Sequence, residues 1–130
     1  MKKLDWKYVK IISESKLLEV EVKFGIKLSP KLREIILKYN NGKPERTCFD
    51  TKTAQGKMLK KILSYNKEDK DNVYIFSELI DKGYIPLAIT EFGDVICESK
   101  EQTICLYKHE FDEFEYVAKD IDDFINNKLY

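Results

Sequence analysis

The chain has 130 residues, the usual size of one domain, and we expect a single domain over residues 1–130. Its 43% hydrophobic and 35% charged residues indicate an ordinary globular core beneath a heavily charged surface. No apolar run approaches the roughly 20 residues of a membrane span, and the N-terminus has no signal-peptide stretch. We therefore expect a cytoplasmic protein, in which Cys48, Cys97 and Cys105 are reduced and mostly buried.

The charge is unevenly distributed along the chain. The first 65 residues hold 16 Lys/Arg against 7 Asp/Glu, a net charge of +9, and residues 66–130 hold the reverse, a net charge of −9. If the two halves occupy different faces, the molecule is strongly dipolar and its acidic side attracts a basic partner. The alternative is that the halves interleave in space and the charges pair.

Apolar spacing predicts helices in the first third of the chain. Residues 4–15 repeat Leu4, Tyr8 and Ile11 at helical intervals, whereas residues 17–24 fit a strand or a short helix and end at Gly25. A second helix begins at Ser29 and Pro30, a typical N-cap and first helical residue, and runs to residue 39. The sequence Asn-Asn-Gly at 40–42 ends it, because these residues tolerate positive φ.

The middle of the chain gives weaker signals. Residues 47–50 resemble a short strand, residues 55–57 a turn, and residues 58–65 either a strand or a helix. The polar stretch 66–71 predicts a surface loop. Residues 73–80 predict a short helix that ends at Lys82 and Gly83.

The last third is rich in strand formers. We expect strands over 84–89, 95–98 and 103–107, joined by turns at 91–94 and 99–101. Because Pro86 donates no backbone hydrogen bond, its strand either lies at a sheet edge or begins nearby. Asp120 caps a final helix with an apolar stripe through residue 129. The order predicts an α+β fold, an antiparallel sheet with helices packed on one side.

No pattern in the sequence indicates catalysis. His109 is the single histidine, and beside Glu110 it is more simply a surface hydrogen-bonding group. Cys48, Cys97, Cys105 and His109 lack the spacing of a closed zinc site, and there is no phosphate-binding loop. The N-terminal lysines permit nucleic-acid binding without indicating it specifically. We expect no catalytic, cofactor or metal site and no nucleic-acid partner.

One segment combines acidic and aromatic residues. Positions 110 to 123 contain seven acidic residues and a single basic residue, Lys119. Exposed rings among carboxylates suit the docking of a basic protein, because the rings supply buried area and the charges accelerate association. The alternative is that the rings enter the core and the carboxylates are only solvated. The candidate partner-binding residues are Glu110, Phe111, Asp112, Glu113, Phe114, Glu115 and Tyr116.

Taken in order, several short motifs resemble the SUKH superfamily, named in part for a fungal regulator of cell-wall synthesis. In the first half these are Trp6, Glu21 four residues before Gly25, Leu28-Ser29-Pro30, and Asn41-Gly42. In the second half they are Pro86 within an apolar strand, Gly93-Asp94, a strand ending in Glu98, and His109-Glu110. The resemblance covers nearly the whole chain and ends on the helix at 121–129.

The resemblance implies a binding module that is not an enzyme. Most bacterial members look like immunity proteins that block polymorphic toxins, often nucleases or deaminases, and usage rich in Lys, Ile and Asn suggests an AT-rich bacterial genome. A nuclease is commonly basic because it holds phosphates, which would complement the acidic half of this chain. The alternative is an intracellular scaffold or regulatory module without a toxin partner. The motif glycines, Pro86 and Asp94 are expected to be architectural.

Overall fold

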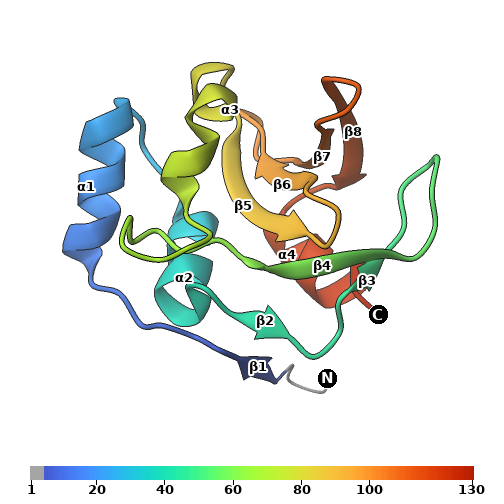
Figure 1. Ribbon diagram of the computed structural model, residues 1–130, viewed down its shortest axis with the longest axis horizontal. Coiled ribbons are helices and arrows are strands. Elements are labelled where there is room, and N and C mark those ends of the chain that lie inside the picture. Colours follow the sequence, from blue (N-terminus) through green and yellow to red (C-terminus); the bar gives the residue numbers. More distant parts are fainter. Residues whose placement is uncertain (1–4) are drawn as a thin grey trace.

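The computed structural model describes residues 5–130, and its centre is a curled antiparallel sheet (Figure 1). Six strands follow one another in chain order, so each pairs with its sequence neighbours. They are β3 (Cys48–Phe49), β4 (Lys57–Ile62), β5 (Ile85–Thr90), β6 (Val95–Glu98), β7 (Ile104–Lys108) and β8 (Glu113–Ala118). A separate pair joins β1 (Trp6–Lys7) to β2 (Lys43–Pro44). The architecture is α+β, as the sequence predicts.

Capping residues set the ends of several helices. They are α1 (Glu14–Phe24), α2 (Pro30–Tyr39), the 3-10 turn η1 (Val73–Phe76) leading into α3 (Ser77–Asp81), and α4 (Ile121–Asp123) continuing as the π-helical η2 (Phe124–Lys128). The Ser29 hydroxyl accepts the Leu32 amide at the start of α2, and Asp120 accepts the Asp123 amide at the start of α4. Gly25 ends α1 in the left-handed conformation, with φ of 63°. The predicted N-caps at Ser29 and Asp120 and the predicted helix end at Gly25 are confirmed.

The main core lies between the sheet and the helices α1, α2 and α4. Leu17 of α1, Ile36 of α2 and Phe124 of the C-terminal helix are fully buried there. Alternation along β6 sends Ile96 into this core, whereas Val95 and Cys97 point to the opposite face. On that face they form a smaller cluster with Leu79 of α3 and half-buried rings, among them Tyr84 and Phe114.

The helix predicted over residues 4–15 is wrong for residues 5–13, because only Glu14 and Ser15 are helical, as the start of α1. Residue 4 lies outside the described residues. The chain forms β1 and then an extended segment up to α1. Trp6 stacks on Tyr39 with ring centroids 4.1 Å apart, and the amide of Lys10 donates to the carbonyl of Asn40 at 2.9 Å. Gly42 permits this approach, because a Cβ there would lie 3.1 Å from the Trp6 ring. Tertiary contacts thus override helical spacing.

The two ambiguous segments resolve in opposite ways. Residues 17–24 are helical within α1, and residues 57–62 form strand β4. Pro86 lies in a central strand, so the edge placement is wrong. It is the second residue of β5, so the placement near the strand's start is right, and the register with β6 shifts between Pro86 and Ala88. The sequence interpretation missed β8 entirely.

The curl of the sheet brings its two edges toward each other. The last residue, Tyr130, pairs with Cys48 of β3 through both backbone hydrogen bonds, at 2.8 and 3.0 Å. The hydroxyl of Thr53, in the loop after β3, donates to Glu115 of β8 at 2.8 Å. Edge strand β3 is thereby covered, and β8 stays at the other edge of the sheet.

Candidate protein-docking site

Two neighbouring turns are fastened together at one end of the sheet. The first joins β5 to β6 through residues 91–94, and the second joins β7 to β8 through residues 109–112. Asp94 Oδ1 accepts the backbone N–H of His109 at 3.2 Å and lies 2.6 Å from His109 Nδ1. Gly93 has a φ of 92°, and the His109 ring lies 3.5 Å from where its Cβ would be. His109 therefore joins the second turn to the first, through its bonds to Asp94 and the packing of its ring against Gly93.

Each of these turns presents a phenyl ring to solvent. Phe92 is 83% exposed and Phe111 is 66% exposed. Both line a shallow hollow of about 210 Å³ together with His109 and Glu110. Exposed rings of this size on adjacent turns are unusual for residues that have no partner, because each leaves a large apolar area in water.

The carboxylates around these rings are free of internal partners. Glu91, Glu110 and Glu113 are exposed and form no ion pair within residues 5–130. Two lysines also line the hollow, but each already has a carboxylate partner. Lys57 pairs with Asp94 at 3.9 Å, and Lys108 pairs with Glu115 at 3.3 Å. We call the set Phe92, Phe111, Glu91, Glu110 and Glu113 the tip surface.

The structure places only part of the predicted acidic segment on this surface. Asp112 accepts from Lys82 at 3.0 Å and from the Tyr107 hydroxyl at 2.8 Å, and these two bonds lower the pKa of its carboxyl. Burial opposes ionisation of Glu115, but hydrogen bonds from Thr53 and Lys108 outweigh it and lower its pKa. These two carboxylates are therefore partly neutralised within the chain.

The aromatic residues of that segment also divide. Phe114 is half-buried and stacks on Tyr84 with centroids 3.8 Å apart. Tyr116 is 48% exposed on β8, beside a different hollow lined by Lys52 and Lys128. The tip surface thus unites Glu110, Phe111 and Glu113 and leaves out the rest of the predicted set.

Sequence reasoning missed Phe92 and Glu91. The turn chemistry of 91–94 was recognised, and a phenylalanine inside a four-residue turn is itself a signal, because a turn has no core-facing side. What the sequence does not carry is the contact between Asp94 and His109, residues 15 positions apart.

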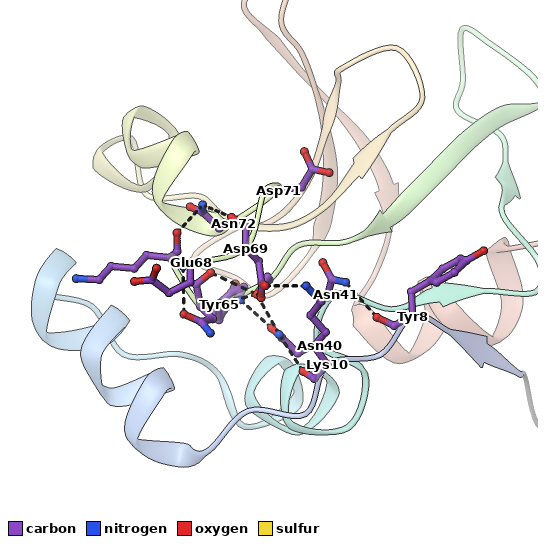
Figure 2. Close-up of polar contacts among 12 residues, drawn as sticks. Tyr8, Lys10, Asn40, Asn41, Tyr65, Glu68, Asp69, Asp71 and Asn72 are labelled. Carbon is purple, nitrogen blue, oxygen red and sulfur yellow. Dashed lines mark hydrogen bonds and ion pairs between the residues drawn. The ribbon is translucent and has the colours of Figure 1, made fainter.

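A second polar cluster, drawn in Figure 2, is structural. The side chain of Asn40 is fully buried and donates to the Lys10 carbonyl and the Ser64 hydroxyl, both at 3.1 Å. Its Oδ1 accepts the amide of Tyr65 at 2.7 Å. Ser64 in turn donates to Asp69, which also pairs with Lys10 at 2.9 Å. Each of these groups is satisfied by another, so the cluster holds chain segments together and presents no reactive group.

The neighbouring residues extend the same cluster. Asn41, at φ 65°, donates to the Tyr8 carbonyl at 3.0 Å and accepts from Lys61 at 2.9 Å. Asn72 donates to the Asp69 carbonyl at 2.9 Å and accepts the Tyr74 amide, which closes the loop over residues 66–72. Figure 2 shows these contacts joining the N-terminal segment, the end of α2 and the loop.

Two acidic motif residues are likewise occupied internally. Glu21 accepts the Leu28 amide at 2.9 Å and the Arg33 guanidinium at 2.6 Å. Glu98 is buried, which raises its pKa, and accepts the Ser29 hydroxyl at 3.0 Å. Glu21 therefore joins α1 to the start of α2, and Glu98 joins the start of α2 to strand β6 of the sheet.

The two oppositely charged halves interleave. Lysines of the first half pair with aspartates of the second at distances from 2.9 to 3.9 Å. The lysines are Lys10, Lys31, Lys57, Lys60 and Lys61, and the aspartates are Asp69, Asp71, Asp94, Asp120 and Asp122. These pairs reduce the charge separation between the two halves of the chain. Negative charge that is not paired within residues 5–130 remains at the tip surface.

Two kinds of feature are absent from the described residues. Within residues 5–130, no group of three or more His, Cys, Asp or Glu side chains is arranged to hold a metal ion. None of the helices in that range combines the length and apolar character needed to cross a bilayer.

Comparison with known proteins identifies a family. No curated protein and no solved structure matches the chain. A family model, described as SMI1 / KNR4 family (SUKH-1), matches residues 11–127 and so covers the two turns, Asn40 and every strand of the six-stranded sheet. The chain belongs to the SMI1 / KNR4 family (SUKH-1).

Proposed function

We propose that this chain is an immunity protein that binds a cognate toxin, of the basic nuclease type, and blocks it without chemical change. The observation that carries the proposal is the tip surface, where Phe92 and Phe111 are exposed beside three glutamates that form no ion pair within residues 5–130. Family membership makes a protein partner reasonable.

The energetics of such a surface suit tight protein binding. Burying one phenyl side chain contributes roughly 1.5–3 kcal/mol, and interface energy concentrates in a few central aromatic anchors. Carboxylates around them accelerate the approach of a positively charged partner. A nuclease carries such charge because it holds phosphates.

The proposed mode of action is occlusion. The candidate residues provide contact area and charge, and His109, the one imidazole of the chain, is engaged with Asp94. We propose no catalytic residue, no cofactor, no membrane contact and no nucleic-acid partner, and we place the encounter in the cytoplasm.

The test is co-expression with the product of the neighbouring toxin gene, scored by growth. The wild-type chain should restore growth, and F92A/F111A should fail to do so while binding the purified toxin at least about 30-fold more weakly, as expected for losing about 2 kcal/mol or more of anchor energy. The matched control is I11A/I75A, which truncates two side chains that are 85% and 60% exposed elsewhere. Equal rescue by both double variants would exclude the tip surface.

The charge component is tested separately by association kinetics. E91Q/E110Q/E113Q should slow association by about tenfold at low salt and leave dissociation nearly unchanged. D112N, at a carboxylate paired with Lys82, should have a much smaller effect. An association rate insensitive to the triple change would remove the electrostatic part of the proposal.

The second candidate, a scaffold without a toxin partner, predicts a different outcome. A second exposed apolar surface on α1, separate from the tip, is the observation that favours it. In that case no neighbouring toxin is rescued, and several partners bind with moderate affinity.

A further inference from the structure

Helix α1 has apolar residues on two faces. Leu17 and Val20 are fully buried in the main core. Leu18 and Val22 point away from it and are 57% and 74% exposed. Since residues four apart on a helix are neighbours, these two form a continuous apolar strip that nothing within residues 5–130 covers.

A groove runs along this strip. It has a volume of about 900 Å³ and lies between α1 and the segment formed by Lys67 and Tyr74. The Tyr74 ring packs against Phe24 with centroids 5.4 Å apart, which fixes this wall of the groove. From Lys16 to Lys23 the groove follows α1 for roughly 10 Å, or two turns of helix.

The rim of the groove is basic. Lys23 on α1 and Lys67 on the opposite side form no ion pair within residues 5–130. Lys16 pairs with Glu19 at 3.4 Å, so that pair is neutral. The net rim charge is positive and opposite in sign to the tip surface, so the two surfaces select different partners.

We propose that the α1 groove docks an amphipathic helix of a partner protein whose apolar stripe is flanked by acidic residues. A helix lying alongside α1 places side chains at i, i+3, i+4 and i+7 over Leu18 and Val22. Carboxylates on both sides of its stripe then reach Lys23 and Lys67. This surface is separate from the tip surface and does not depend on the proposed toxin.

The experiment uses the full chain and two synthetic peptide probes. Both are helical peptides of about 18 residues with the same leucine stripe, flanked in one by glutamates and in the other by lysines. Binding is followed by the backbone amide shifts of the ¹⁵N-labelled chain. The acidic peptide should shift the amides of Ser15 to Lys23 and Tyr74 and should bind at least about tenfold more tightly than the basic one at low salt.

Variants identify the site and its charge. L18S/V22S should abolish the shifts, and K23E/K67E should reverse the preference between the two peptides. The matched control is K52E/K128E, at two exposed lysines that form no ion pair within the described range, and it should leave the preference intact. Unchanged melting of every variant confirms that the fold is retained.

Four results of the peptide experiments would overturn the proposal. They are equal binding of the two peptides, binding of neither, shifts that map to the tip surface, and retention of binding in L18S/V22S. Concentration-dependent dimerisation that L18S/V22S abolishes would assign the groove to a second copy of the chain instead. Binding to anionic lipid vesicles in preference to the acidic peptide would assign it to a membrane surface and would equally refute the partner helix.

Discussion

Asn40 shows how much one buried side chain can organise. Its amide group makes three hydrogen bonds, one to Lys10 and two to the adjacent residues Ser64 and Tyr65, so it joins the end of α2 to two other stretches of the chain. The sequence predicts the end of a helix here, and α2 does end at Tyr39. It does not predict the bonds, because the choice of partner for a polar side chain depends on the assembled fold.

Replacing Asn40 with alanine should lower the free energy of unfolding by about 3 kcal/mol, since it strands the buried amide of Tyr65 and the Lys10 carbonyl. Urea denaturation followed by circular dichroism measures this. Asn126→Ala, at an exposed asparagine, serves as control and should change stability by less than about 0.5 kcal/mol. A loss below about 1 kcal/mol in Asn40→Ala would mean that water replaces the amide.

Among the elements, those with strong local signals were predictable and those with competing signals were not. Helix α2 has a serine cap, a proline at its first position and an apolar stripe, and all three favour the same structure. Strand β8 was missed although Glu113, Phe114, Glu115 and Tyr116 alternate as a strand does. Their charges and rings indicated a docking site or a solvated patch, so the period of two was overlooked.

The N-terminal segment is held by tertiary contacts, and Trp6 is its anchor. Trp6→Ala should cost about 2 kcal/mol, less than the roughly 3–5 kcal/mol of a fully buried tryptophan, because this ring is half-buried. Hydrogen exchange should show the amide of Lys10, bonded to the Asn40 carbonyl, losing protection before the strands do. Ile11→Ala, which removes a side chain that is 85% exposed, should preserve that protection. Unaltered protection of the Lys10 amide in Trp6→Ala would show that Asn40 and Asn41 hold the N-terminal segment in place without the Trp6 ring.

At the scale of the whole molecule, the opposite net charges of the two halves are used for internal pairing. Lys10, Lys31 and Lys61 each reach an aspartate from the other half of the chain. The sequence shows that the two halves carry opposite net charge. It is compatible both with halves on separate faces and with halves that interleave. Only the distances between residues remote in the chain distinguish an external dipole from interleaved charge.

Attraction between the halves should also accelerate folding. Because the Debye length falls from about 10 Å at 0.1 M salt to about 3 Å at 1 M, refolding from urea should slow by about two- to fivefold over that range. Stopped-flow fluorescence of Trp6 measures the rate. K10Q/K31Q/K61Q should refold more slowly at low salt and show a weaker salt dependence. Refolding that is independent of sodium chloride would mean that these pairs form after the transition state.

The fold class, the helix caps and most strands could be predicted, whereas the candidate site could be predicted only in part. Glu110, Phe111 and Glu113 were found from composition, because adjacent charges and rings are visible in a sequence. Phe92 was not, since it reaches the same surface through the pairing of β5 to β8 and the contact between Asp94 and His109. Sites assembled from two turns require the pairing of strands to be known first.

The fastening of one turn to the next by Asp94 and His109 has a consequence for how this protein can change. The bond fixes the backbone of both turns, while Phe92 and Phe111 point outward and contribute little to the core. Substitutions at these outward positions can therefore accumulate without loss of folding. The surface chemistry of these two turns can therefore change one residue at a time on an unchanged framework.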